Sequence, residues 1–223
     1  MSDGYIASML GLLTPAVLET LYMVAASAVM SYVIGLPLGI LLVVTSKGHI
    51  VPAPWVERTL GTIINILRSA PFIVLMVALI PFTRMVIGTS IGTTAAVVPL
   101  VVAAAPFVAR VVESSLKEIP HGVIEAAQSM GASPFQIIYK VLLPEAKSSL
   151  ILGAAITIIN VIGYTAMAGA VGGGGLGDLA IQYGYNRFRT DVMIITVAVL
   201  VVFVQAVQTL GTRLAVSAMH TKR

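Results

Sequence analysis

Residues 192–210, VMIITVAVLVVFVQAVQTL, decide the fold, because this stretch contains no charged side chain. A helix needs about 20 mostly apolar residues to cross the hydrocarbon core of a bilayer. The stretch therefore predicts a membrane-spanning helix.

The composition of the whole chain also indicates a membrane protein. Of the 223 residues, 58% are hydrophobic and 10% are charged, and the mean hydropathy is +1.01. Soluble domains are about 45–50% apolar and about 25% charged. Burying this much apolar surface in water would need a larger core than a chain of this length can build. We therefore expect lipid around the protein and an all-α, polytopic fold.

Four further segments are apolar enough to span a membrane, or nearly so. They cover residues 16–44, 63–82, 91–112 and 150–171. Five transmembrane helices are therefore predicted, within one permease-like domain over residues 1–223. In the first segment we expect Thr14 as N-cap, Pro15 as first helical residue and a tilt or bend near 35–39.

The second segment, 63–82, gives the weakest prediction. Asn65, Arg68 and Ser69 interrupt its apolar run, and Pro71 breaks a helical hydrogen-bond ladder.

The distribution of basic residues predicts the orientation of these spans. If the C-terminus is cytoplasmic, the positive-inside rule is satisfied by Lys47, Arg58, Lys117, Lys140, Lys147, Arg213, Lys222 and Arg223. Arg84, Arg187 and Arg189 would then lie outside, against the rule. The N-terminal tail carries Asp3 and no basic residue, and we expect it outside, without a cleaved signal peptide.

Charge, cysteine and histidine usage exclude several other classes. The net charge is +4, but the basic residues are spread between apolar stretches, which is typical of membrane borders and not of nucleic-acid binding. The chain has no cysteine, and its three histidines have no zinc-binding spacing. Five spans are also an unusual number for an internally repeated carrier, so we expect a homodimer with a pore on the two-fold axis.

The longest stretch outside the spans, residues 116–146, predicts two short helices joined by a tight turn. The first is expected to begin near Pro120 and to stop at Met130, before Gly131. The second begins with Ser133, and a glutamine three residues later completes a capping-box pattern. It should end near residue 142, because Pro144 disfavours helix at the residue before it.

Such a hairpin can transmit force as a rigid body, although its geometry alone also fits an ordinary loop without a partner. The pattern is Glu125-Ala126-Ala127, three residues, Gly131, nine residues, then Val141-Leu142-Leu143-Pro144. It resembles the EAA loop of ATP-binding-cassette (ABC) importer permeases, and only Val141, in place of isoleucine, departs from the family pattern.

The resemblance implies that this loop is a coupling hairpin that docks on a separate ATPase. The docking residues that it implies are Glu125, Ala126, Ala127, Gly131, Leu143 and Pro144. It further implies that this chain is not an enzyme and binds no cofactor, with ATP and magnesium held by the partner.

Other stretches are similar to the methionine-type permease of this family. They are 68–72, 80–84, 86–92, 104–107, 163–167 and 172–177, and with the five-span layout the resemblance covers nearly the whole chain. It implies a homodimer in the bacterial cytoplasmic membrane, two ATPase copies, an extracytoplasmic methionine-binding protein, and uptake of L- and D-methionine. The family gate matches Met167, whose alternative role is to fill a gap between helices.

Three more residues are candidates for the translocation pathway: Tyr164, Asn160 and Arg68. Asn160 has a second interpretation as an interhelical hydrogen-bonding residue. Arg68 has a second interpretation as a side chain that extends to the cytoplasmic interface. Arg110 and Glu113 lie three apart on one helical face, and we expect them to pair as a structural contact.

The run 172–177 satisfies the G-x-G-x-x-G pattern, but a spanning segment precedes it and no βαβ unit follows. We therefore expect a flexible turn at the outer mouth and no nucleotide site.

The sequence thus predicts a permease that works by alternating access. One alternative is a permease for another small amino acid or nutrient. The other is an ion-coupled carrier that acts alone, which usually needs buried ionisable groups.

Overall fold

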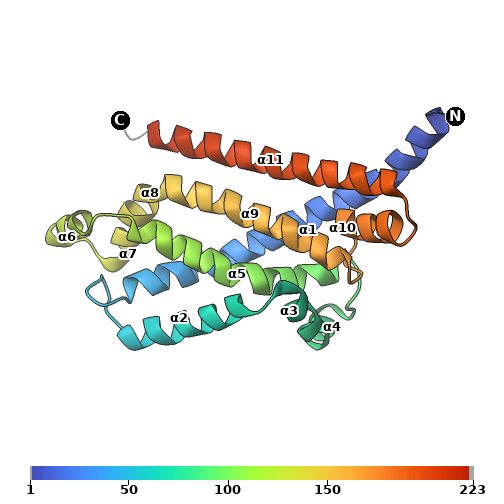
Figure 1. Ribbon diagram of the computed structural model, residues 1–223. Coiled ribbons are helices and arrows are strands. Elements are labelled where there is room, and N and C mark those ends of the chain that lie inside the picture. The colour runs from blue at the N-terminus through green and yellow to red at the C-terminus, as the bar shows by residue number, and fades with distance from the viewer. Residues whose placement is uncertain (1, 221–223) are drawn as a thin grey trace. The chain divides into compact units, whose positions relative to one another are not determined.

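The structure is a computed structural model that describes residues 2–220. Lys222 and Arg223, which contributed to the predicted orientation, lie outside the described residues, as does the side chain of Asp3. The elements are α1 (Ser2–Val44), α2 (Pro54–Ser69), α3 (Phe72–Ala78), α4 (Ile80–Ile87), α5 (Thr93–Lys117), α6 (His121–Ser129), α7 (Pro134–Ile137), the π-helix η1 (Ile138–Leu142), α8 (Leu143–Glu145), α9 (Lys147–Gly169), α10 (Gly175–Leu179), the π-helix η2 (Ala180–Tyr185) and α11 (Thr190–His220) (Figure 1).

The described residues contain helices and no strand, which confirms the all-α prediction. Four helices are long and apolar enough to cross a membrane: Ala7–Val44, Thr93–Lys117, Lys147–Gly169 and Thr190–Met219. The broken pair α2 and α3 makes a fifth span if it is counted as one. The polytopic fold predicted from the sequence is therefore confirmed.

The start of the first span differs from the prediction. Helix α1 begins at Ser2, so Thr14 is not its N-cap and Pro15 is not its first residue. Met9 lies in a buried apolar cluster with residues of α10 and α11, including Leu176 and Val192. Tertiary packing of the preceding segment therefore outweighs the local capping signal.

The segment 35–39, where a tilt or bend is expected, is continuous helix within α1, and the bend itself stays a prediction. Gly35 and Gly39 instead allow close approach to α5. A Cβ atom at Gly35 would lie 2.6 Å from Cβ of Val108, and one at Gly39 would lie 2.6 Å from Cβ of Val112. These glycines serve helix packing.

The second predicted span, 63–82, begins earlier than predicted and is broken into separate helices. Helix α2 begins earlier, at Pro54, and ends at Ser69, and α3 begins only at Phe72. Pro71 is extended, with φ −59° and ψ 133°. Proline cannot donate to the helical ladder and disfavours helix at the residue before it, which explains the break at Ala70.

The chain divides into two compact units, each assembled from three separate stretches. Unit 1 comprises Met1–Met30, Ala70–Ala104 and Ile158–Val207, and unit 2 comprises Ser31–Ser69, Ala105–Thr157 and Gln208–Arg223. Helices α1, α5, α9 and α11 each contribute to both units. The prediction of a single permease domain stays a prediction.

Unit 1 is built around two buried apolar clusters. One joins Met23 of α1, Phe72 and Met76 of α3, Leu100 of α5 and further small side chains. The other joins the start of α1 to α10 and the start of α11. Together these two clusters hold α3, α10 and the start of α11 against the part of α1 that belongs to unit 1.

Unit 2 has its largest buried cluster where α1 and α5 end. Val43 and Val44 of α1 pack there with Val112 and Leu116 of α5, and the segment between α5 and α9 contributes Ile124, Ala127, Ile137, Leu142 and Ala146. This cluster seats the predicted hairpin on the ends of two long helices.

Candidate functional site

The first arm of the hairpin has the predicted boundaries. Helix α6 follows Pro120 and ends at Ser129, with Met130 as its C-cap. Gly131 has φ +78°, a left-handed conformation that L side chains seldom adopt. The turn after α6 therefore depends on the glycine that the sequence places there.

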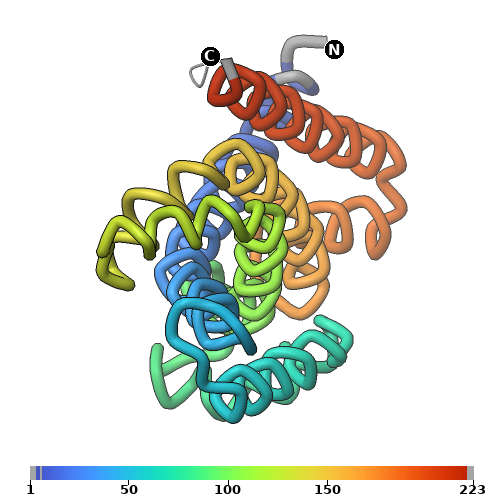
Figure 2. The backbone as a smooth tube through the Cα atoms, turned by 90° about the vertical axis from the view of Figure 1, so that its left-hand side faces the viewer, coloured from blue at the N-terminus to red at the C-terminus, as the bar shows by residue number. Residues whose placement is uncertain are grey.

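The second arm begins with the predicted capping box. The Gln136 N–H donates to Oγ of Ser133 at 3.4 Å, and the Ser133 N–H donates to Oε1 of Gln136 at 2.9 Å. Both bonds satisfy N–H groups that a helix start leaves unpaired. Figures 1 and 2 show the two arms doubling back between α5 and α9.

The end of this arm differs from the prediction. Pro144 does not stop the helix at Leu143, since the chain continues through η1 and α8 to Glu145. The Leu143 N–H bonds to the Ile138 carbonyl, five residues back. A proline normally clashes with the carbonyl four residues before it. We attribute its tolerance here to the wider π-turn, which changes where that carbonyl points.

The inner face of the hairpin is apolar and buried. Ile124 and Ala127, three apart on α6, both lie in the unit 2 cluster, and Ala127 is only 4% exposed. Ala127 therefore packs on the ends of α1 and α5, and the docking role implied for it stays a prediction.

The outer face of the hairpin is exposed. Glu125, Ala126, Gly131 and Pro144 lie on the surface, and Leu143 is half-buried. Three large apolar side chains, absent from the sequence prediction, share this surface: Met130 is 80% exposed, Phe135 75% and Tyr139 66%. We call Glu125, Ala126, Met130, Phe135 and Tyr139 the hairpin face.

Two members of the hairpin face are held in a fixed arrangement. The rings of Phe135 and Tyr139 are nearly parallel, at an interplanar angle of 4°, with centroids 6.4 Å apart. Exposed aromatic side chains mark protein contact sites more often than solvated surface. The signal was present in the sequence, because large apolar residues such as Met130, Phe135 and Tyr139 occur in a loop expected to lie in water.

The start of α6 carries a cluster of titratable groups. Nδ1 of His121 lies 3.5 Å from Oε1 of Glu125, and the His49 ring meets the His121 ring edge-on at 6.0 Å. Burial, and then the nearby His121 and Lys117, lower the pKa of His49. The neutral form of His49 is therefore favoured beneath the hairpin.

Three of the predicted pathway residues lie on one face of α9. Asn160, Tyr164 and Met167 follow each other at helical spacing within unit 1. Tyr164 is half-buried and stacks on Phe72, with centroids 4.6 Å apart, while Met167 is 48% exposed. Met167 is therefore not enclosed within its unit. A side chain that only fills a gap within that unit would be enclosed.

Arg68, the fourth predicted pathway residue, belongs to unit 2 and is exposed on the last turn of α2. Its guanidinium carbon lies 5.9 Å from the centroid of the Phe107 ring on α5.

The glycine-rich run is a turn only over 172–174, because Gly175–Gly177 already belong to α10, and it is tied to α1 within unit 1. The Gly175 N–H donates to Oε2 of Glu19 at 2.7 Å, and the Leu176 N–H donates to Oγ1 of Thr20 at 2.8 Å. Side chains of α1 therefore cap the start of α10, at the place where a nucleotide phosphate would sit in a dinucleotide fold.

Comparison with known proteins identifies the family. Residues 35–215 match the binding-protein-dependent transport system inner membrane component family. This chain belongs to that family. The match includes the whole hairpin and the helices from the end of α1, at residue 35, to residue 215 of α11, so the chain is a membrane component of an ABC transport system.

Relatives within the family are similar over most of the chain. The probable D-methionine transport system permease protein MetI of Vibrio cholerae is 52% identical over 90% of this chain and 89% of its own. The D-methionine transport system permease protein MetI of Escherichia coli is 55% identical over 72% of this chain and 74% of its own.

Solved structures agree with this assignment. A chain of the MetNI methionine ABC transporter in an inward-facing conformation has a TM-score of 0.93 and 51% identity, covering 95% of this chain and 98% of that one. An amino acid ABC transporter chain at 20% identity has a TM-score of 0.77 and supports the fold alone.

Proposed function

We propose that this chain is the permease subunit of an importer that carries methionine, as the L- and D-isomers, across the bacterial cytoplasmic membrane. The observation that carries the proposal is the 51% identity and TM-score of 0.93 with a chain of the MetNI methionine ABC transporter. Two relatives named for D-methionine transport support the same substrate.

The energy for transport comes from a separate ATPase that docks on the hairpin face. The pair of exposed, nearly parallel aromatic rings and the exposed Met130 supply apolar contacts, and Glu125 and Ala126 of the same hairpin supply an acidic and a small side chain. Interfaces of this kind concentrate binding free energy in a few aromatic anchors. Since the inner face packs on α1 and α5, force applied to the hairpin reaches both helices.

The working complex contains two copies of this chain, two ATPase subunits and an extracytoplasmic methionine-binding protein. ATP and magnesium are bound by the ATPase, and this chain has no catalytic role. Asn160, Tyr164 and Met167 line the translocation pathway, with Met167 at the gate. Arg68 serves the cytoplasmic end of the same pathway.

Reconstitution tests this proposal. Proteoliposomes would hold the chain with its cognate ATPase, with ATP enclosed and methionine-binding protein outside. We expect labelled L-methionine to accumulate, D-methionine to accumulate as well, and neither to accumulate when the ATPase or ATP is omitted.

Two other outcomes would overturn specific parts of the proposal. Accumulation without ATPase and ATP would identify an ion-coupled carrier. ATP-dependent accumulation of another amino acid, with no methionine uptake, would keep the importer class and overturn the substrate.

A further inference from the structure

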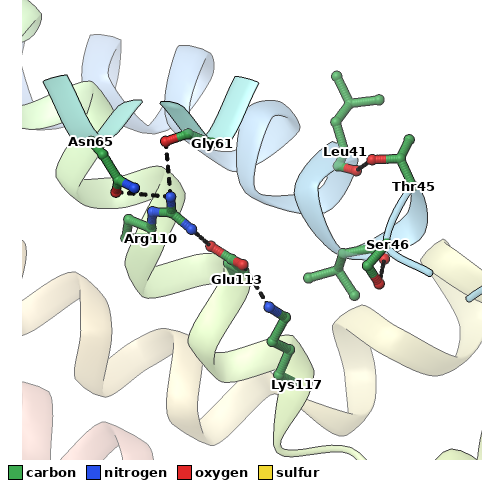
Figure 3. A network of polar contacts seen from close by, with 9 residues as sticks. Leu41, Thr45, Ser46, Gly61, Asn65, Arg110, Glu113 and Lys117 are labelled. Carbon is green, nitrogen blue, oxygen red and sulfur yellow. Dashed lines mark hydrogen bonds and ion pairs between the residues drawn. The ribbon is translucent and has the colours of Figure 1, made fainter. Parts of the chain in front are cut away.

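Arg110 of α5 joins two helices of unit 2 through one guanidinium group. Nη2 donates to the Gly61 carbonyl at 3.0 Å and to Oδ1 of Asn65 at 2.8 Å, both on α2, and Nη1 donates to Oε2 of Glu113 on its own helix. Figure 3 shows the guanidinium pointing from α5 toward α2, with Glu113 beside it. Three partners at fixed positions need the planar fork of arginine.

The contact continues along α5 to the start of the hairpin. Glu113 is 6% exposed, and its second oxygen, Oε1, accepts a hydrogen bond from Nζ of Lys117 at 2.7 Å. Lys117 is the last residue of α5, and its neighbour Leu116 packs in the same buried cluster as Ile124 of α6. An unbroken series of polar contacts therefore extends from α2 to the helix end on which the hairpin is seated (Figure 3).

Helix α2 has little else to hold it in unit 2. Only Gly61 and Ile64 are buried along its length, and Ile64 meets Leu42 and Ala109 in a small cluster. Arg68 adds a second polar contact, over the Phe107 ring. The position of α2 beside α5 thus combines these polar contacts with a small apolar cluster, to which Leu60 of α2 also contributes.

The stability of the folded chain is a weak reason for placing the Arg110–Glu113 ion pair between helices. An ion pair removed from water is seldom more stabilising than apolar side chains of similar volume. Ionisable groups in spanning helices are commonly functional. A polar contact can instead fix one helix to another in a single register, which apolar packing specifies less sharply.

We propose that Arg110 is a positioning residue of the transport cycle, which makes α2 follow α5 when the ATPase displaces the hairpin. The inference rests on the proposed function. Without the contact to Asn65, the hairpin and α5 would still move, but α2 would follow only through the bond from Arg110 to the Gly61 carbonyl, the Arg68–Phe107 contact and its small apolar cluster. ATP hydrolysis would then continue with less substrate moved per ATP.

Asn65→Ala is the sharpest test, because it removes the side-chain acceptor on α2 and leaves the Arg110–Glu113 pair and the bond to the Gly61 carbonyl intact. Asn65 is exposed, so the substitution leaves no buried cavity. In proteoliposomes with ATPase and binding protein, methionine taken up per ATP hydrolysed should fall about tenfold or more, the value expected for losing a hydrogen bond to a charged group. The ATPase rate and the amount of assembled complex should stay near wild type.

Two matched variants separate this role from a structural one. Asn65→Asp keeps an acceptor for Arg110 and should keep the wild-type ratio of uptake to hydrolysis. Thr62→Ala removes a hydroxyl group on the same helix, and this hydroxyl donates to the Arg58 carbonyl and not to α5. This variant should also keep the wild-type ratio of uptake to hydrolysis.

The outcomes are distinct. A wild-type ratio in Asn65→Ala, or an equal loss of assembly, hydrolysis and uptake, would overturn the inference. A wild-type complex that shows no ATP-dependent uptake would overturn the proposed function instead.

Discussion

Single residues set the geometry at which the hairpin can work, and Gly131 is the clearest case. Its φ of +78° is strained for any side chain, yet a Cβ atom there would meet nothing within 4 Å. The requirement for glycine is therefore conformational and not steric. Ala127 is the opposite case, since it is buried on the inner side of α6 and only a small side chain fits there.

Gly131→Asp should abolish ATP-dependent uptake while the protein still inserts and assembles as a dimer. The substitution places a side chain in the left-handed region at a cost of about 1–2 kcal/mol. It also adds a carboxylate beside the hairpin face. Uptake in proteoliposomes and the dimer fraction in detergent are the two measurements.

Gly131→Asn is the control for this prediction, because asparagine tolerates the left-handed conformation better than other side chains and carries no charge. It should retain more uptake than the aspartate variant. Normal uptake in Gly131→Asp would contradict the coupling role of this turn.

At the scale of an element, the hairpin is a small rigid body with two different faces. The capping box fixes where its second arm begins, and the buried residues of both arms fix it on α1 and α5. The π-turn η1 lets Pro144 remain within the helical segment instead of ending it. What this construction leaves in water is the aromatic pair of the hairpin face.

Phe135→Ser should weaken binding of the ATPase about tenfold or more, the effect expected for truncating an aromatic anchor at an interface. The ring is 75% exposed, so its removal leaves no cavity in the fold. Affinity of the detergent-solubilised permease for the cognate ATPase, in the nucleotide-free state, is the measurement.

The matched control is Phe188→Ser, the same change at a side chain that is 89% exposed in the loop before α11. We predict this loop to lie on the opposite side of the membrane, and the control should bind the ATPase like wild type. Equal weakening by both changes would point to a general effect of surface hydrophobicity and contradict the role of Phe135.

At the scale of the whole molecule, the helices specify a polytopic protein, and the basic residues predict its orientation. The predicted orientation places the hairpin in the cytoplasm, where we propose that the ATPase docks, and the loop before α11 outside. Arg84, Arg187 and Arg189 oppose the rule that favours this orientation.

Because the chain contains no cysteine, single substitutions can report this orientation directly. In intact cells, an impermeant maleimide should label Arg187→Cys and leave Lys140→Cys unlabelled until the membrane is opened. Both positions are exposed. Labelling of Lys140→Cys in intact cells would reverse the predicted orientation and separate the hairpin from any cytoplasmic ATPase.

The sequence by itself determined the spans, the hairpin boundaries at Pro120, Met130 and Ser133, and the pairing of Arg110 with Glu113. These features depend on local rules: the apolar length needed to cross a bilayer, the conformation of glycine, the hydrogen bonds of a cap, and the spacing of neighbours on one helix.

The tertiary structure alone decided the features that depend on residues far apart in the chain. Packing of Met9 against α10 and α11 extends α1 past its apparent cap, and contact with α5 explains Gly35 and Gly39. The bond from Arg110 to Asn65 joins positions 45 residues apart, and no local pattern predicts it. Burial of Ala127 and exposure of Phe135 follow from how the hairpin sits on α1 and α5, which only the folded chain specifies.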